Sequence, residues 1–367
     1  MDARRFDEFS AKKCQKLVIS PLLFTIDFTK DKIMKVVYIK EFGGAENLEI
    51  REVEDLSKPK NTQVLVNIKA SAINRADILQ RKGLYSAPKG FPERILGLEF
   101  AGEIAEIGNN VKDFKIGDRV FGITAGGANA EFILTDKSLL AKIPENLSFK
   151  EAAAIPEAFI TAHDAIFTQG NLQSSETLLI HAVGSGVGLA ALQLAKAKNT
   201  KVIGTSRTID KLEKCNEFGL DFGILTETDS VVTNPKTFAE ILNYHTNEKG
   251  VNVVLDLVGA SYLAANLESL AVKGRLILVG LVGGREAQLN LGMALAKRAK
   301  IIGTVLRSRS ATEKAEATRL FIEDVLPLLA EGKIKPNLDK VFKMEDVKEA
   351  HEYLESNESF GKVVLEF

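Results

Sequence analysis

Hydrophobic residues follow two different rhythms along this chain of 367 residues. From Met34 to about Ile155, short segments alternate between apolar and polar positions and are separated by turns that contain glycine and asparagine. Alternation of this kind is typical of strands with one buried face. We therefore expect a compact, β-barrel-like domain in this part of the chain. Its clearest strand segments are 63–69, 102–107, 119–123 and 130–134.

The second rhythm begins beyond Phe149, where helical segments alternate with strands that are apolar almost throughout. Strands that are apolar on both sides belong to a parallel sheet covered by helices on both faces. This half therefore predicts a doubly wound, Rossmann-type α/β domain. Helix is expected at 150–169, and strands are expected at 178–183, 201–205, 251–257 and 275–282.

The chain leaves the second rhythm after about Lys300. A long helix is expected at 311–331, a second helix at 345–356 and a last strand at 362–367. Because the cofactor-type domain lies before the C-terminus, we expect this last piece to return to the β-rich domain and complete it.

These patterns predict an α/β protein with two folded domains. The β-rich domain comprises 34–156 and 301–367, and the Rossmann domain comprises 157–300. Residues 1–33 differ in composition from the rest and are expected to be an N-terminal extension. A chain that begins at Met34 should therefore keep its stability and activity.

Composition narrows the classes of function. Lys and Arg number 48 against 49 Asp and Glu, so the net charge of −1 gives no large attraction to nucleic acid. The two cysteines provide no disulfide framework and suggest a reducing compartment, so we expect a cytoplasmic protein. No run of about 20 apolar residues is present, and no membrane span is expected.

The segment 177–196 carries the strongest chemical signal. An apolar strand runs into Gly184, Gly186 and Gly188, and an Ala- and Leu-rich helix begins there. Backbone N–H groups of such a turn, around Val187, can approach a diphosphate that the helix N-terminus attracts. The spacing is G-x-G-x-G and departs from the G-x-G-x-x-G dinucleotide pattern, and a glycine turn also serves close packing alone.

The next strand indicates which dinucleotide is bound. It ends in Ser206 and Arg207, with Lys211 one turn into the following helix, and no acidic residue occurs before Asp210. NAD-binding folds place an acidic residue here for the ribose 2′-hydroxyl, whereas hydroxyl and cationic donors suit a 2′-phosphate. The sequence therefore favours NADPH, although an exposed loop with ordinary surface charge would contain the same residue types.

A second dense segment is 71–85. Asn74, Asp77 and Arg81 recur at helical spacing and are expected to share one helix face, and Gly83 is expected to end that helix just before Tyr85. A salt-bridged surface turn would produce the same spacing.

Together these motifs resemble those of a known family. The chain is similar to the zinc-independent quinone oxidoreductases of the medium-chain dehydrogenase/reductase superfamily, and most like their stress-inducible, zeta-crystallin-like branch. The resemblance runs from about Met34 to Phe367, and it implies a GroES-like catalytic domain beside the Rossmann domain. It rests on the segments 71–85, 95–102, 117–121, 152–158, 177–196 and 306–310.

The resemblance also implies roles for individual residues. Asn74 and Tyr85 would line the pocket where nicotinamide meets substrate, and a tyrosine hydroxyl can hydrogen-bond a quinone oxygen as charge develops there. The cofactor would be contacted by Asn74, Thr161, Gly186, Val187, Gly188, Ser206, Arg207, Lys211, Val258, Gly280 and Leu281.

No metal is expected. Zinc-dependent relatives carry Cys-His where this chain has Asn74-Arg75, and Gly-His-Glu where it has Gly97-Leu98-Glu99. Two cysteines and four scattered histidines cannot supply a cysteine-rich tetrahedral site. Of the remaining candidates, His181 is expected to be a buried structural histidine rather than a proton donor, and Cys215 a small apolar filler.

The activity expected from the resemblance is NADPH-dependent reduction of quinones by hydride transfer without metal. A 2-enoyl or alkenal reductase of the same superfamily is the alternative, since such enzymes share the cofactor domain. A third reading is a non-enzymatic role, because zeta-crystallin-like proteins also serve as lens proteins and bind RNA, but the chain shows no basic stripe. A homodimer is expected, with Ile277–Leu281 near a sheet edge that could pair across a two-fold axis.

Overall fold

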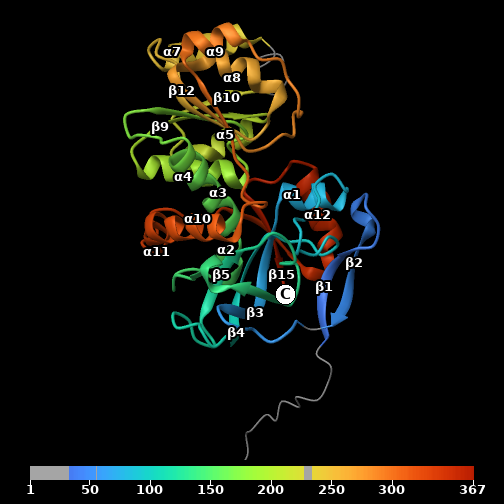
Figure 1. Cartoon of the computed structure of the whole chain (residues 1–367). Coiled ribbons are helices and arrows are strands. Elements are labelled where there is room, and N and C mark those ends of the chain that lie inside the picture. Colours follow the sequence, from blue (N-terminus) through green and yellow to red (C-terminus); the bar gives the residue numbers. More distant parts are fainter. Residues whose placement is uncertain (1–32, 55, 227–233) are drawn as a thin grey trace, which may run out of the picture. The chain divides into compact units, whose positions relative to one another are not determined.

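A computed structural model describes residues 33–54, 56–226 and 234–367 (Figure 1). The expected extension therefore lies outside the described residues except for Ile33. The strands outside the Rossmann part are β1 (Ile33–Ile39), β2 (Leu48–Glu54), β3 (Gln63–Ile73), β4 (Glu99–Ile107), β5 (Arg119–Ile123), β6 (Phe132–Asp136), β7 (Leu140–Lys142), β14 (Leu338–Lys343) and β15 (Lys362–Glu366).

Seven of these strands form one mixed sheet in the order β14-β15-β3-β4-β5-β7, with β6 paired to β3, while β1 and β2 form a separate hairpin. The last strand of the chain lies antiparallel to β3, from Val363 opposite Ile73 to Glu366 opposite Ala70. This register brings the first residue of β15, Lys362, next to the residues that follow β3. The pairing also gives the C-terminal piece its place in the β-rich sheet.

The Rossmann part is a six-stranded parallel sheet. Its strands are β8 (Thr177–Ile180), β9 (Lys201–Ser206), β10 (Phe222–Leu225), β11 (Val251–Asp256), β12 (Leu270–Leu278) and β13 (Lys300–Gly303). They lie in the order β10-β9-β8-β11-β12-β13. From the central strand β8 the chain builds one half of the sheet through β9 and β10. It then returns to the centre at β11 and builds the other half through β12 and β13. Ligands of such sheets bind at the carboxyl ends of the strands where the direction reverses.

Helices occur in both the Rossmann part and the β-rich part of the chain (Figure 1). They are α1 (Arg75–Arg81), α2 (Phe149–Ala153), α3 (Pro156–His163), α4 (Gly186–Ala197), α5 (Ile209–Cys215), α7 (Pro235–His245), α8 (Leu263–Ser269), α9 (Leu291–Lys297), α10 (Ala311–Asp324), α11 (Leu326–Ala330) and α12 (Val347–Glu355). A π-helical turn at 164–169 continues α3, and short 3₁₀ turns occupy 45–47, 137–139, 216–218, 260–262 and 344–346.

The prediction that two long helices are continuous is wrong. The helix expected at 150–169 is interrupted before Pro156, and the one expected at 311–331 is divided at Val325, two residues before Pro327. Proline has no N–H for the i→i−4 ladder and fixes its own φ, so a helix ends before it and a new one begins.

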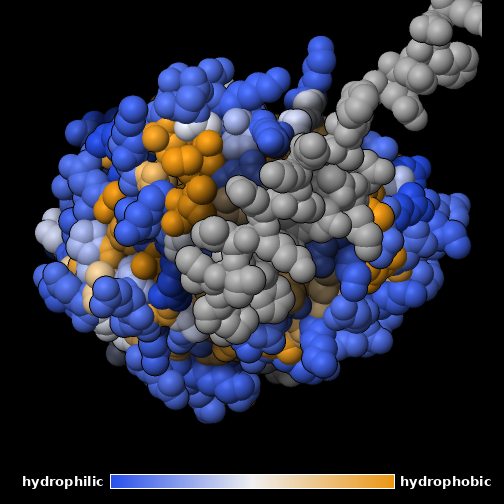
Figure 2. Space-filling view, turned by 90° about the horizontal axis from the view of Figure 1, so that it is seen from below, coloured by the Kyte–Doolittle hydropathy of each residue, from blue (hydrophilic) through white to orange (hydrophobic). Residues whose placement is uncertain are grey.

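Burial on both faces of the parallel sheet holds the Rossmann part together. Leu178, Leu179 and Ile180 of β8 are completely buried, and they divide between two clusters of buried apolar side chains on opposite faces. Burial of each such side chain stabilises the fold by about 1.5–3 kcal/mol. Polar side chains dominate the face of the molecule shown in Figure 2, with smaller apolar groups between them. No helix of the described residues is long and apolar enough to cross a membrane.

The strand that carries Ile277 is not free to pair with a second subunit. Both of its sides are occupied, because β12 pairs with β11 and with β13. The strand at this end of the described sheet is β13, in which Ile301 is exposed. The expectation that Ile277–Leu281 pairs across a two-fold axis is therefore wrong.

Candidate functional site

The glycine turn lies at the carboxyl end of the central strand β8 and opens α4. Ser185 caps this helix, and its Oγ accepts a hydrogen bond from the N–H of Gly188 at 3.1 Å. A Cβ on Gly188 would lie 2.6 Å from the carbonyl oxygens of Ala182 and Val183, so only glycine fits there. The N–H groups of the first helical residues, including Gly186 and Val187, have no acceptor within the helix. The turn therefore fits a diphosphate.

The residues predicted to hold the 2′-phosphate follow the neighbouring strand β9. Ser206 is buried, Arg207 is exposed, and Lys211 is half-buried with its Nζ 2.5 Å from the carbonyl oxygen of Asn357. Burial lowers the pKa of Lys211, and the positive charge of Arg207 lowers it further. Cationic groups are thus crowded beside the glycine turn, which suits an anionic ligand.

Val258, Gly280 and Leu281 lie in the loops that follow β11 and β12. The buried carboxylate of Asp256 fixes the first loop by accepting hydrogen bonds from the N–H groups of Val258 and Gly259, at 2.7 and 2.8 Å. The two loops touch, because a Cβ on Gly280 would lie 2.3 Å from the carbonyl oxygen of Leu257. These residues therefore share the strand-end edge of the sheet with the glycine turn.

Asn74 belongs to a buried polar network at the start of α1. Its Nδ2 donates to Glu99 Oε1 at 2.9 Å, and its Oδ1 accepts from Lys362 Nζ at 2.5 Å. Lys362 also forms an ion pair with Glu99 at 2.6 Å, with side chains that are 6% and 0% exposed. The second oxygen of Glu99 accepts from the N–H of Glu157 at 2.8 Å. The Asn74 amide is therefore held in one orientation from both ends.

Asp77 fixes the backbone around Asn74. Its two carboxylate oxygens accept from the N–H groups of Asn74 and Gly97, at 2.8 and 2.9 Å. Burial raises the pKa of Asp77 to about 6 despite these hydrogen bonds. Asp77 and Arg81 lie in α1 and Asn74 is the N-cap residue of this helix, and Gly83 follows it with a φ of 73°.

Tyr85 is half-buried and is positioned by Arg307. The Arg307 Cζ lies 4.8 Å from the centre of the Tyr85 ring, and its Nη1 donates to the Tyr85 carbonyl oxygen at 3.3 Å. The guanidinium also donates to Ala125 O and to Gln80 Oε1, at 2.9 and 2.5 Å. Burial raises the pKa of Tyr85, so its hydroxyl stays protonated and able to donate.

Thr161 lies on α3, which is otherwise almost completely packed. Of the eight residues in this helix, Glu157 and Thr161 are partly buried and the other six are buried. Glu157 and Thr161 are four residues apart and so lie on one face of the helix. Burial raises the pKa of Glu157 to about 8, and the charge of Glu99 raises it as well.

The residues at the zinc-ligand positions of the zinc-dependent relatives do not fit a zinc ion. Asn74 and Leu98 replace a cysteine and a histidine, and the Lys362 ammonium already lies within hydrogen-bond distance of Asn74 and Glu99. No group of three or more His, Cys, Asp or Glu side chains that could hold a metal is found among the residues that the structure describes.

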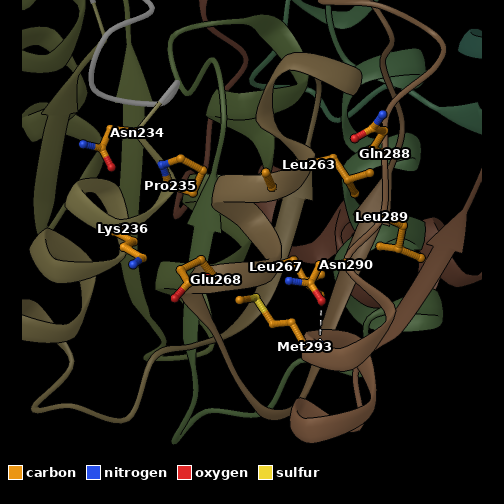
Figure 3. A pocket seen from close by; sticks show the side chains of 11 residues that line it. Asn234, Pro235, Lys236, Leu263, Leu267, Glu268, Gln288, Leu289, Asn290 and Met293 are labelled. Atoms are coloured by element: carbon orange, nitrogen blue, oxygen red, sulfur yellow. Dashed lines mark hydrogen bonds between the residues drawn. The ribbon is translucent and has the colours of Figure 1, made fainter.

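Other candidates lie away from this chemistry. His181 is completely buried between Thr205 Oγ1 and Asn266 Oδ1, at 3.0 and 2.5 Å, and burial lowers its pKa. Burial raises the pKa of the Cys215 thiol to about 12. A pocket of about 380 Å³ in the Rossmann part contains none of the predicted site residues (Figure 3). It is lined by residues such as Lys236, Leu263, Leu267, Glu268, Leu289 and Met293.

Comparison with known proteins agrees with this architecture. Residues 60–145 match the family described as alcohol dehydrogenase GroES-like domain, and residues 186–323 match the family described as zinc-binding dehydrogenase. The human protein named quinone oxidoreductase is 32% identical over 339 residues, which cover 92% of this chain and 99% of that protein.

Two solved structures are also similar. A quinone oxidoreductase of Pseudomonas syringae pv. tomato superposes with a TM-score of 0.80 at 29% identity, covering 91% of this chain and 100% of that one. A mycobacterial protein solved in complex with NADPH superposes with a TM-score of 0.80 at 27% identity, with the same coverage.

A GroES-like sheet combined with a Rossmann domain defines the medium-chain dehydrogenases/reductases, which are NAD(P)-dependent oxidoreductases. Within that superfamily the chain belongs to the quinone oxidoreductase family.

Sequence reasoning did not assign a role to four charged residues of this site. Glu99, Lys362, Arg307 and Glu157 come from four separate parts of the chain and converge around Asn74 and Tyr85. The available signal was a charged residue directly before a short apolar stretch at the start of a strand, as at Glu99 in β4 and Lys362 in β15.

Proposed function

We propose that the protein is an NADPH-dependent reductase of quinones. The observation that carries the proposal is that the carboxyl ends of β8 and β9 lie side by side. The glycine turn follows β8, and Ser206, Arg207 and Lys211 follow the adjacent parallel strand β9. The turn suits a diphosphate, and the three side chains suit a 2′-phosphate and offer no carboxylate to a ribose hydroxyl.

The Rossmann-side residues of the site are proposed to hold the cofactor. Gly186, Val187 and Gly188 would contact the diphosphate, and Thr161, Val258, Gly280 and Leu281 would contact the nicotinamide half. When bound, the cofactor supplies the hydride, and the protein positions and shields it.

On the β-rich side, Asn74 and Tyr85 would form the wall that receives the substrate. Asn74 is oriented by Glu99 and Lys362, and Tyr85 is oriented by Arg307. The Tyr85 hydroxyl would stabilise the negative charge that develops on a carbonyl oxygen when hydride arrives. Because a quinone delocalises this charge, hydrogen-bond donors suffice there.

The ratio of kcat/KM for NADPH to that for NADH, measured with one quinone, tests the cofactor. We expect NADPH to be preferred, and a preference for NADH would contradict the 2′-phosphate site. The same assay with 2-alkenals separates quinone reduction from double-bond reduction, the alternative function.

We also propose a cytoplasmic homodimer. The support for dimerisation is β13, which ends the described sheet and exposes Ile301, together with the exposed apolar residue Val305 four positions further on. Sedimentation equilibrium of the wild type and of Ile301→Lys tests this proposal, and a monomeric wild type would contradict it.

A further inference from the structure

The reduction of a quinone consumes a proton as well as a hydride. None of the residues assigned above is a donor of that proton. The Tyr85 hydroxyl can stabilise charge, but its pKa is raised by burial, so it makes a weak acid. The remaining titratable groups around the site are therefore the ones to search for a proton donor.

Glu157 faces the same side of α3 as Thr161. All six other residues of this helix are buried, whereas Glu157 and Thr161 are partly buried and share one face of the helix. The backbone N–H of Glu157 is anchored to Glu99, which also holds Asn74. The helix is thus fixed against the network that orients Asn74.

The Glu157 carboxyl lies among charges of both signs from several elements. It acts electrostatically on Tyr85, and it interacts with Lys314, whose ammonium is 5.3 Å from the centre of the Phe91 ring. The charged and titratable groups around it are Glu99 of β4, Asp77 of α1, Lys362 of β15, Arg307 after β13, Lys314 of α10 and Tyr85.

These surroundings keep Glu157 in its acid form near neutral pH. Desolvation and the negative charge of Glu99 raise its pKa to about 8, and the cations Lys362 and Arg307 oppose that shift without cancelling it. A carboxyl with a pKa near the working pH is well matched to general acid catalysis.

We propose that Glu157 is the proton donor of the reaction. This step rests on the proposed function. The quinone accepts a hydride from NADPH, and the oxyanion that results takes the proton of the Glu157 carboxyl. The O–H bond of Glu157 breaks and that of the hydroquinone forms. The Glu157 carboxylate is reprotonated from water before the next turnover.

Kinetics of Glu157→Gln test this role, because glutamine keeps the shape of the side chain but cannot act as an acid. We expect kcat with a quinone at pH 7 to fall by roughly 100-fold. We expect NADPH binding, followed by cofactor fluorescence, to stay within about twofold, a change worth less than 1 kcal/mol. The wild-type kcat should fall as the pH rises through about 8, and this decline should be missing in Glu157→Gln.

Two further variants serve as controls. Glu157→Asp keeps an acid and should recover part of the activity together with the alkaline decline. Glu145→Gln removes an exposed carboxyl before α2 and should match the wild type. If Glu157→Gln keeps both the wild-type kcat and its pH profile, the proposal is overturned.

An infrared titration of the free protein provides a readout that does not need turnover. Between pH 7 and pH 9, the wild type and Glu145→Gln should lose the band of a neutral carboxyl, and Glu157→Gln should not. Absence of this band in the wild type overturns the role of Glu157 whatever the acceptor. If the band is present but no quinone is reduced by the wild type, it is the proposed function that fails.

Discussion

The Arg307 guanidinium lies over the ring of Tyr85, with Cζ 4.8 Å from the ring centre, although the two residues are 222 positions apart in sequence. Arg307 is only 3% exposed, and it also hydrogen-bonds the carbonyl oxygens of Tyr85 and Ala125. The tyrosine is thereby fixed from the C-terminal part of the chain. This contact presents its hydroxyl in a set position to whatever substrate enters.

Replacing Tyr85 by phenylalanine tests the hydroxyl without removing the ring from Arg307. We expect kcat/KM for quinones to fall roughly tenfold or more, because a hydrogen bond to the developing oxyanion is lost. Tyr244→Phe is the matched control, since Tyr244 is 79% exposed. Equal kcat/KM values for Tyr85→Phe and wild type would leave Tyr85 as part of the pocket wall only.

The ion pair of Lys362 and Glu99 should behave as a coupled unit. Lys362→Met leaves a buried carboxylate unpaired and should lower the free energy of unfolding by about 3–5 kcal/mol. The double variant Lys362→Met, Glu99→Gln should lose less than the sum of the single losses, because no uncompensated charge remains. Urea unfolding of the four proteins measures this coupling, and strictly additive losses would argue against it.

Replacing Arg207 by alanine should affect one cofactor more than the other. The loss of a charged contact to the 2′-phosphate is expected to lower kcat/KM for NADPH by about tenfold, which corresponds to about 1.4 kcal/mol. The value for NADH should stay near that of the wild type. Lys214→Ala removes a neighbouring cation that pairs with Asp210 and serves as the control. An equal loss with both cofactors would mean that Arg207 does not contact the 2′-phosphate.

The contribution of Glu157 and Asp77 to stability should decrease as the pH rises from about 4.5 to about 8. Burial raises the pKa values of Glu157 and Asp77 in the folded protein, to about 8 and about 6, above their ordinary values of 4.5 and 3.8. In this window the folded protein binds protons that the unfolded chain has released, so raising the pH favours unfolding.

Thermal midpoints at pH 6 and pH 9 measure this effect. The midpoint of Glu157→Gln should fall less between these values than that of the wild type, whereas Glu145→Gln should follow the wild type. A change in midpoint between these pH values that is the same in the wild type and in Glu157→Gln would contradict the raised pKa of Glu157.

The local parts of the site could be predicted from the sequence. An apolar strand, the glycines at 184–188 and a helix lie within one continuous segment, and Asn74, Asp77 and Arg81 lie within another. Each pattern involves residues that are close in sequence, so it can be recognised before the fold is known.

The polar network around Asn74 could not be predicted in this way. Lys362 and Glu99 are 263 residues apart, and they meet only because β15 returns to pair with β3. The burial that raises the pKa of Glu157 likewise depends on elements packed together from distant parts of the chain. The sheet edge was predicted wrongly for the same reason, because the pairing of β13 with β12 is not evident from the sequence.

Steady-state oxidation of NADPH in the presence of ortho- and para-quinones tests the central claim most directly. We predict that quinones are reduced with NADPH, at a higher kcat/KM than with NADH and than with 2-alkenals as acceptors. Oxidation of NADPH by none of the quinones, or a preference for NADH, would contradict it.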